Sequence, residues 1–162
     1  MKDEYLLLLP IGSMGVGDDW GPRTPLPLHA TVMPWFSNDN IDNLDVLLGN
    51  LVAASACSGF ELIGQKREAF GPKNEVMVTV LQKTPDLIRL HNKLLFLLAR
   101  HNALPLETQW VGAGYVPHVT DIPQTIFPVK GKVVTSRLVL IHKDQKKVKR
   151  VVKVWGFLSI PF

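Results

Sequence analysis

A histidine is followed two places later by a threonine in two stretches of this sequence, Leu28-His29-Ala30-Thr31-Val32 and Pro117-His118-Val119-Thr120-Asp121. Each stretch contains β-branched residues and is flanked by turn formers, a pattern that predicts a β-strand. Residues i and i+2 of a strand point to the same face, so each stretch should present one imidazole and one hydroxyl side by side. Two such pairs would supply a general acid, a general base and two neutral hydrogen-bond donors.

The two stretches together resemble the 2H phosphoesterase superfamily, which includes the RNA 2′,3′-cyclic phosphodiesterases also called 2′-5′ RNA ligases. Two copies of a hydrophobic-His-x-Thr-hydrophobic motif mark that superfamily, and the first stretch fits the motif fully. The second stretch departs from it, because Asp121 stands where the family usually has an apolar residue. We expect the strand to end there, since Ile122-Pro123 follows; a local turn hydrogen bond of the carboxylate is the alternative. By alternation Asp121 would point away from His118 and Thr120.

The resemblance implies that His29, Thr31, His118 and Thr120 face one another across a cleft and open a 2′,3′-cyclic phosphate with water. One histidine would act as base and the other as acid, because an imidazole titrates near neutral pH. The threonine hydroxyls would bind the non-bridging phosphate oxygens. This scheme needs no metal or other cofactor. Attack by a 2′-hydroxyl in the reverse direction would be ligation at the same site.

Composition predicts an ordinary folded protein. The chain has 162 residues, 46% hydrophobic and 20% charged, and we expect residues 1–162 to form a single bilobal 2H phosphoesterase-like domain. The net charge of +4 is a mild basic excess that is compatible with a phosphate-bearing ligand. Cys57 is the only cysteine, so we expect no internal disulfide and interpret this residue as a buried structural thiol.

The sequence predicts neither a signal peptide nor a membrane span, because its apolar runs are too short for either. We therefore expect a cytoplasmic, monomeric protein. Its expected partner is RNA with a cyclic phosphate end or a small cyclic nucleotide, with no membrane or DNA partner.

Apolar spacing and turn formers predict an α+β fold. The predicted strands are Glu4–Ile11, His29–Phe36, Phe60–Phe70, Glu75–Gln82, Tyr115–Asp121, Lys132–His142 and Val148–Ile160. One predicted helix begins at Ile41 and ends near Gly59, and a second begins at Thr84-Pro85-Asp86 and ends near Arg100. From His29 to Asp121 the order is β-α-β-β-α-β. The family resemblance implies two pseudo-symmetric lobes of antiparallel sheet with outer helices around the cleft.

The segment from Gly12 to Pro27 is rich in glycine and proline and leads directly into the first motif. Long loops in compact domains are usually functional, which makes this one a candidate lid with Trp20 and Arg23 as possible ligand contacts. A loose surface insertion is an equal alternative. In the second helix His91, like His101 near its end, is interpreted as structural.

The family clamps a base on aromatic side chains and steers phosphate with basic ones, and the chain has candidates for both. For base stacking they are Tyr115, Trp35, Trp155 and Phe157, each of which could instead belong to the core. For phosphate they are Lys66, Arg67, Lys73, Lys130, Lys132 and Arg137. The run Lys146-Lys147-Val148-Lys149-Arg150 is interpreted as a solvated hairpin that could also grip an RNA backbone.

Three functional interpretations stay open besides an RNA-end phosphodiesterase. The same residues could hydrolyse cyclic (oligo)nucleotide signals, as some viral members of the superfamily do. A non-catalytic RNA- or nucleotide-binding module is a second alternative. A structural domain in which the motifs are accidental is a third, and it predicts that His29 and His118 lie far apart.

Overall fold

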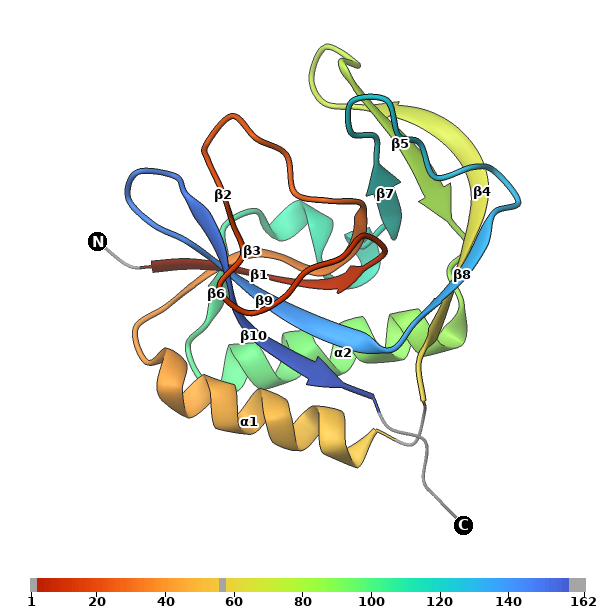
Figure 1. Cartoon of the computed structure of the whole chain (residues 1–162). Helices are drawn as coiled ribbons and strands as arrows, with labels where there is room; N and C mark the ends of the chain where they lie inside the picture. The colour runs from red at the N-terminus through yellow and green to blue at the C-terminus, as the bar shows by residue number, and fades with distance from the viewer. Residues whose placement is uncertain (1–2, 56–57, 158–162) are drawn as a thin grey trace.

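In the computed structural model, which describes residues 3–55 and 58–157, one antiparallel sheet curls through the molecule and two helices cover one of its faces (Figure 1). The strands are β1 (Asp3–Pro10), β2 (Asp19–Trp20), β3 (His29–Asn38), β4 (Phe60–Phe70), β5 (Val76–Leu81), β6 (Leu104–Pro105), β7 (His118–Thr120), β8 (Lys132–Thr135), β9 (Arg137–Lys143) and β10 (Lys149–Gly156). The helices are α1 (Ile41–Ala54), α2 (Pro85–Arg100) and the short 3₁₀ turns η1 (Thr108–Trp110) and η2 (Gly112–Gly114). This confirms the predicted α+β class.

The strand order is β2-β10-β9-β1-β3-β7-β5-β4-β8, with β6 paired to the outer part of β3. The two motif strands, β3 and β7, are therefore neighbours in the middle of the sheet. One half of the sheet lies on the β3 side and the other on the β7 side, so the motifs meet where the halves join.

β1 is buried on both faces, which explains its continuous run of leucines. Leu7 and Leu9 belong to the large core between the sheet and the helices. Leu6 and Leu8 point the other way, into a smaller core beneath the segment before β3. A strand covered on both sides has no polar face, so its sequence does not alternate.

Local capping decides where the helices begin. Thr84 accepts a hydrogen bond from the amide of Leu87 at 3.3 Å, and Pro85 occupies the first position of α2, as predicted. α1 begins after Asn40, whose side chain caps it. It ends at Ala54, short of the predicted end, because the next residue adopts an extended backbone. The prediction for Cys57 lies outside the described residues.

Two predicted strands differ from the observed ones. The expected strand Lys132–His142 is interrupted at Ser136, and its two parts have different partners: β8 pairs with β4, whereas β9 pairs with β1 and β10. The chain thus passes from one half of the sheet to the other within a single apolar run. The second motif strand is also shorter than predicted, since β7 holds only the three residues of the motif.

The segment before β3 is packed against the sheet, which contradicts the loose insertion considered above. Met14 and Leu26 are buried in the smaller core. Asp19 and Trp20 form β2, which pairs with Lys149 and Arg150 of β10, although no strand was predicted in this segment. No helix in the described parts of the chain is long and apolar enough to cross a membrane.

Candidate active site

The pairing of β3 with β7 brings the two motifs together. Ala30 pairs with Val119, and both side chains are completely buried in the core under the helices. The residues on either side of each must point to the opposite face, because strand side chains alternate. In this antiparallel register the motif side chains stand in two cross-strand pairs, His29 with Thr120 and Thr31 with His118. The interpretation of the motifs as accidental, which required distant histidines, is therefore wrong.

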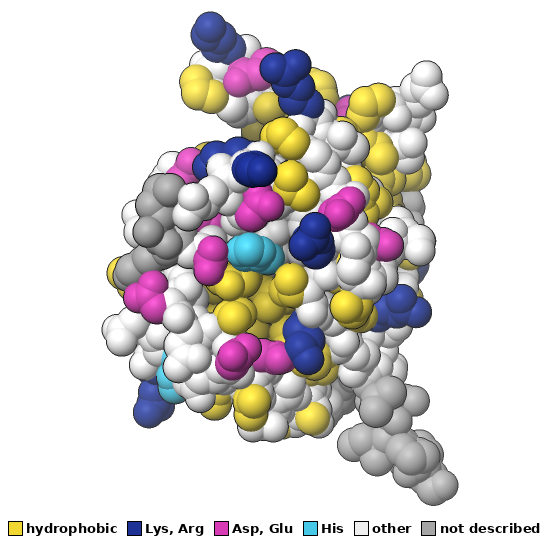
Figure 2. Space-filling model, turned by 60° about the vertical axis from the view of Figure 1, so that its left-hand side comes forward, with side chains coloured by type: hydrophobic (Ala, Val, Ile, Leu, Met, Phe, Trp, Pro, Cys, Tyr) yellow, Lys and Arg dark blue, Asp and Glu magenta, His cyan; other side chains and the backbone are white. Residues whose placement is uncertain are grey.

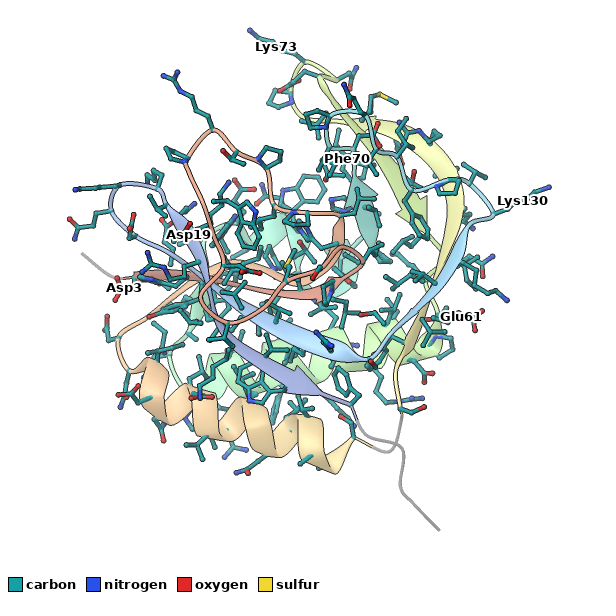
Figure 3. The ribbon with its side chains drawn as sticks, in the orientation of Figure 1. Asp3, Asp19, Glu61, Phe70, Lys73 and Lys130 are labelled. Carbon is teal, nitrogen blue, oxygen red and sulfur yellow. The ribbon has the colours of Figure 1, made fainter. Side chains whose placement is uncertain are left out.

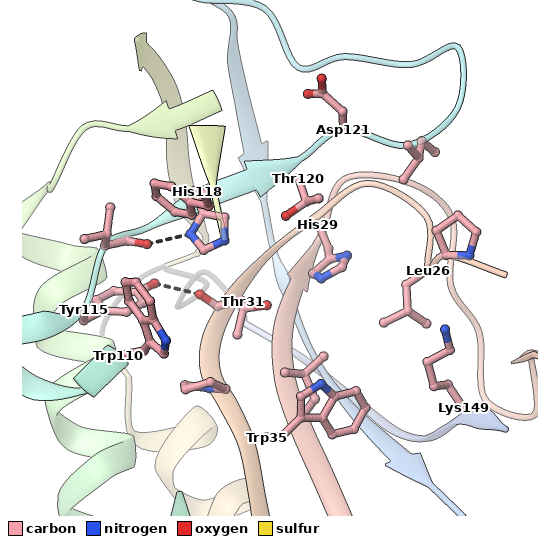
Figure 4. A pocket seen from close by; sticks show the side chains of 16 residues that line it. Leu26, His29, Thr31, Trp35, Trp110, Tyr115, His118, Thr120, Asp121 and Lys149 are labelled. Atoms are coloured by element: carbon pink, nitrogen blue, oxygen red, sulfur yellow. Dashed lines mark hydrogen bonds between the residues drawn. The ribbon is translucent and has the colours of Figure 1, made fainter. Parts of the chain in front are cut away.

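Both histidines are held by the same hydrogen bond. Nδ1 of His29 lies 2.8 Å from the carbonyl oxygen of Pro27, and Nδ1 of His118 lies 2.8 Å from that of Val116. A carbonyl only accepts, so Nδ1 must carry the proton in each ring. The lone pair of each neutral imidazole is then on Nε2. Both side chains line one cavity of about 470 Å³, so Nε2 of each ring is available to a ligand bound there (Figure 4).

The surroundings of the two rings favour their neutral forms. Burial lowers the pKa of His29, and the nearby His118 and Lys149 lower it further, against the effect of the Pro27 carbonyl. Burial likewise lowers the pKa of His118, against the effect of its bond to Val116. Both histidines therefore titrate below the ordinary value, with Lys149 adding a repulsion at His29.

Tyr115 forms the wall of the cavity beside Thr31. Its hydroxyl donates a hydrogen bond of 2.8 Å to the backbone oxygen of Thr31, and burial raises its pKa, so the group stays a neutral donor. The ring stacks on His91 of α2, with 3.9 Å between ring centroids. Tyr115, a candidate binding residue, thus lines the cavity, although it precedes the strand.

His91 is fully buried and has both ring nitrogens in use. Its Nδ1 donates to the oxygen of Val32 at 2.7 Å, and its Nε2 accepts from the amide of Gly112 at 2.9 Å. Only the neutral ring can make both bonds, in line with the lowering of its pKa by burial. His91 is therefore structural, as predicted, and it fixes the ring that lines the cavity.

Two further aromatic side chains stand next to His118. Phe70, at the end of β4, meets the imidazole edge-on at 4.9 Å, and Trp110 stacks against Phe70 at 6.2 Å. Figure 3 shows Phe70 turned toward the middle of the molecule, whereas Lys73 and Lys130 lie at its periphery. Trp110 is 44% exposed although it lines the cavity, so one of its surfaces is open to a ligand.

Asp121 lies at the edge of the cavity, and its carboxylate points away from His118 and Thr120, as predicted (Figure 4). Its two carboxylate oxygens accept hydrogen bonds of 2.6 and 2.5 Å from the guanidinium of Arg67. Arg67 also bonds Thr79, whose hydroxyl in turn donates to the oxygen of Phe127. The carboxylate raises the pKa of the Arg67 guanidinium, and the guanidinium holds the pKa of Asp121 below its ordinary value. The strand ends before Asp121, as predicted.

Comparison with known proteins agrees with this geometry. A family model described as the 2′-5′ RNA ligase superfamily matches residues 17–126, a span that holds both motifs. The chain belongs to this superfamily. The resemblance to 2H phosphoesterases is thereby confirmed, and membership supports an enzyme with a phosphodiesterase-type function. A sequence search of curated proteins finds no match.

Solved structures of the same fold extend over the whole chain. A phosphoesterase has a TM-score of 0.63, with 16% identity over 99% of this chain and 100% of that one. E. coli LigT complexed with 3′-AMP has a TM-score of 0.58, with 16% identity and the same coverage. A protein of Thermus thermophilus has a TM-score of 0.59, also at 16% identity and the same coverage. These likenesses show the fold, which is the one predicted.

Within this superfamily fold, only Tyr115 and Trp35 of the predicted binding residues line the cavity. The residues that do not line it are Trp20, Arg23, Lys66, Arg67, Lys73, Lys130, Lys132, Arg137, Trp155 and Phe157. Trp20 packs against the smaller core, and Arg23 is exposed on the segment before β3. Lys66 is also exposed, with a carboxylate of Glu68 at 3.8 Å. Trp155 packs against α1 at Gly49, on the helix-covered face of the sheet. Arg67 touches the cavity only through its pair with Asp121.

Sequence reasoning missed Phe70 and Trp110, which the superfamily fold brings to the cavity. It named Asp121 and Lys149 but did not place either of them at the cavity. Only Asp121 carried a signal, because its place in the second motif adjoins Thr120. Lys149 belongs to a charged run, and nothing in the sequence distinguishes it from Lys146 or Lys147.

Proposed function

We propose that this chain is a metal-independent phosphodiesterase that hydrolyses 2′,3′-cyclic phosphates, or related phosphodiester bonds, in RNA ends or small nucleotides. The register of β3 against β7 carries the proposal. It places the two histidines and the two threonines on one wall of the cavity, with the histidines as diagonal neighbours on the two strands. Diagonal cross-strand neighbours are about 7–8 Å apart at the backbone, which leaves room for one phosphate between the rings.

The phosphate would lie with its reacting bonds in line between the imidazoles. One Nε2 takes a proton from water, and the other gives a proton to the departing ribose oxygen, so the ring O–P bond breaks as the new O–P bond forms. The product is a ribose phosphomonoester. The hydroxyls of Thr31 and Thr120 donate to the non-bridging oxygens, where negative charge grows in the transition state.

We assign His29 as the base and His118 as the acid in hydrolysis. The charge of Lys149 disfavours a second positive charge on His29, whereas no cation is found to act on the His118 ring among the described residues. A base must begin neutral and an acid must begin protonated. The repulsion from Lys149 favours the neutral form of His29, which suits the base, and His118 is then the acid.

The cavity walls support a nucleotide as the ligand. Trp110 and Phe70 present aromatic surface beside His118, and a base can stack on such a surface whatever its identity. E. coli LigT has been seen complexed with 3′-AMP, with phosphate and with ATP, which supports the same class of ligand here. Both halves of the sheet line the cavity, so we propose that they act as one unit.

The test is hydrolysis of 2′,3′-cyclic nucleotides and of RNA ending in a cyclic phosphate, in the presence of EDTA. We expect product from the wild type, and a loss of about 10²- to 10⁴-fold in kcat in His29→Ala and in His118→Ala, the usual worth of a general acid or base. His101→Ala, at the C-terminal end of α2, is the matched control and should keep full activity. Circular dichroism checks that each variant is folded.

Two results would contradict the proposal. Activity that EDTA removes would show that a metal is needed. A wild type that binds these compounds without converting them would identify a nucleotide-binding module instead.

A further inference from the structure

Lys149 is the one lysine or arginine that lines the cavity within the described parts of the chain. It opens β10, where the register places it between Trp20 of β2 and Lys143 of β9. The sheet therefore fixes its backbone on both sides. Its side chain reaches the cavity from the half that carries β3, next to Leu26 in Figure 4.

The charge of Lys149 has no carboxylate partner among the described residues. Its Nζ donates one hydrogen bond, 2.6 Å long, to the backbone oxygen of Thr24. An ammonium group has three donors, so two remain for a ligand. The neighbouring Lys143 is different, because it pairs with Glu4 at 2.9 Å and lies over the ring of Trp35.

Other cations near the cavity are likewise compensated. Arg67 is held by Asp121, and Arg150, which follows Lys149, pairs with Asp19 at 3.3 Å. Figure 2 shows acidic and basic side chains interspersed over one face of the molecule, not gathered into a continuous basic groove. A ligand anion in the cavity would thus find its positive partner at a single point.

Lys149 lies away from the place proposed for the reacting phosphate, which is between the two imidazoles. Figure 4 shows Lys149 beyond His29 as seen from His118, at the end of the cavity lined by Leu26 and Trp35. The charge of Lys149 acts on His29, and Lys149 itself has a pKa lowered by burial and by Lys143. An anion bound there would offset the repulsion between Lys149 and His29 and that between Lys149 and Lys143.

We propose that Lys149 binds a second phosphate of the substrate, on the 5′ side of the nucleotide whose cyclic phosphate lies between the histidines. This inference rests on the proposed function and narrows it. The enzyme then prefers a 5′-phosphorylated nucleotide, or the last nucleotide of an oligonucleotide, over a free cyclic nucleoside phosphate. Charge-assisted bonds of lysine to phosphate give the preference its physical basis.

The test compares adenosine 2′,3′-cyclic phosphate with the same compound phosphorylated at its 5′ position. The readout is the ratio of the two kcat/KM values. Changes in folding or in the pKa of His29 affect both substrates alike and cancel in this ratio. We expect the wild type to favour the 5′-phosphorylated compound by at least about tenfold, the worth of one charge-assisted hydrogen bond. In Lys149→Gln the ratio should fall to about one.

Lys146→Gln removes an exposed lysine of the same hairpin and should keep the wild-type ratio. Salt gives a second readout, because ionic screening weakens the attraction between a lysine and a phosphate. Lys149→Gln should make kcat/KM for the 5′-phosphorylated substrate less dependent on salt than it is in the wild type.

An unchanged ratio in Lys149→Gln, or a wild type with no preference, would overturn the inference. A binding measurement tests this inference independently of the proposed hydrolysis. Even if neither substrate is hydrolysed, adenosine 3′,5′-bisphosphate should bind about tenfold more tightly than 3′-AMP, and only in proteins that keep Lys149. Equal dissociation constants would overturn the inference in that case too.

Discussion

At the scale of single residues, two backbone carbonyls prepare the chemistry of the site. Each holds Nδ1 of one histidine and so leaves the lone pair of the neutral ring on Nε2. The carbonyls lie two residues before His29 and His118, so the same short local geometry is repeated in both halves. The repeat extends beyond the side chains of the motif to the backbone that orients them.

Asp121 is the residue at which this chain departs most from the motif, and it should stabilise the fold. Asp121→Asn would leave Arg67 without its charged partner, and we expect a loss of about 1–2 kcal/mol in the free energy of unfolding. Asp86→Asn, which breaks an exposed pair with Arg89 on α2, should cost less than about 0.5 kcal/mol. Urea unfolding measures both.

The same pair predicts a dependence on pH. Arg67 lowers the pKa of Asp121, so the pair stabilises the folded state above the ordinary pKa of an aspartate, about 3.9. That contribution is lost as the pH falls through the lower pKa of the folded state. Equal losses in the Asp121 and Asp86 variants at neutral pH would contradict this account.

At the scale of elements, α2 positions the cavity wall through His91. His91→Phe keeps a stacking ring for Tyr115 but removes the partner of the buried Val32 oxygen and of the partly buried Gly112 amide. We expect a loss of about 2–4 kcal/mol in the free energy of unfolding. Asn92→Ala, at the next and exposed position of α2, should change it by less than about 0.5 kcal/mol. Chemical denaturation compares the two, and similar losses would show that His91 is not a structural centre.

Elements defined by local chemistry could be predicted from the sequence. Thr84 and Pro85 specify the start of α2 by capping, and alternation within the motif specifies which side chains of β3 share a face. The break at Ser136 could not be predicted, because it depends on two different strands receiving the two parts of one apolar run.

The site followed the same rule. The paired motif is local, and it predicted the four side chains that the register brings together. Trp110, Phe70 and Lys149 reach the cavity from distant segments, so their role depends on the strand order. Trp20 and Trp155 were candidate ligand contacts but pack against the cores. An aromatic residue in a sequence does not by itself reveal whether it faces the core or a ligand.

At the scale of the whole molecule, acid should destabilise the fold. Burial lowers the pKa of His29, His91 and His118, so below about pH 6.5 the unfolded chain binds protons that the folded chain resists. Stability is therefore full above that pH and falls as the pH drops. The slope can reach about 1.4 kcal/mol per pH unit for each proton.

Thermal unfolding from about pH 8 to about pH 5 measures this slope. The double variant His29→Gln, His118→Gln removes two of the three groups, so its slope should fall to about a third of the wild-type value. A wild-type midpoint that does not change with pH in this range would contradict the assignment of three buried neutral histidines.

The central claim is that His29 and His118 act on one phosphate as base and acid, and the pH dependence of kcat/KM tests it most directly. The wild type should give a bell-shaped profile with its maximum on the acid side of about pH 6.5, because both pKa values are lowered in the free enzyme. His29→Ala should lose the acid limb, and His118→Ala should lose the alkaline limb. A profile that stays bell-shaped in either variant would contradict the claim.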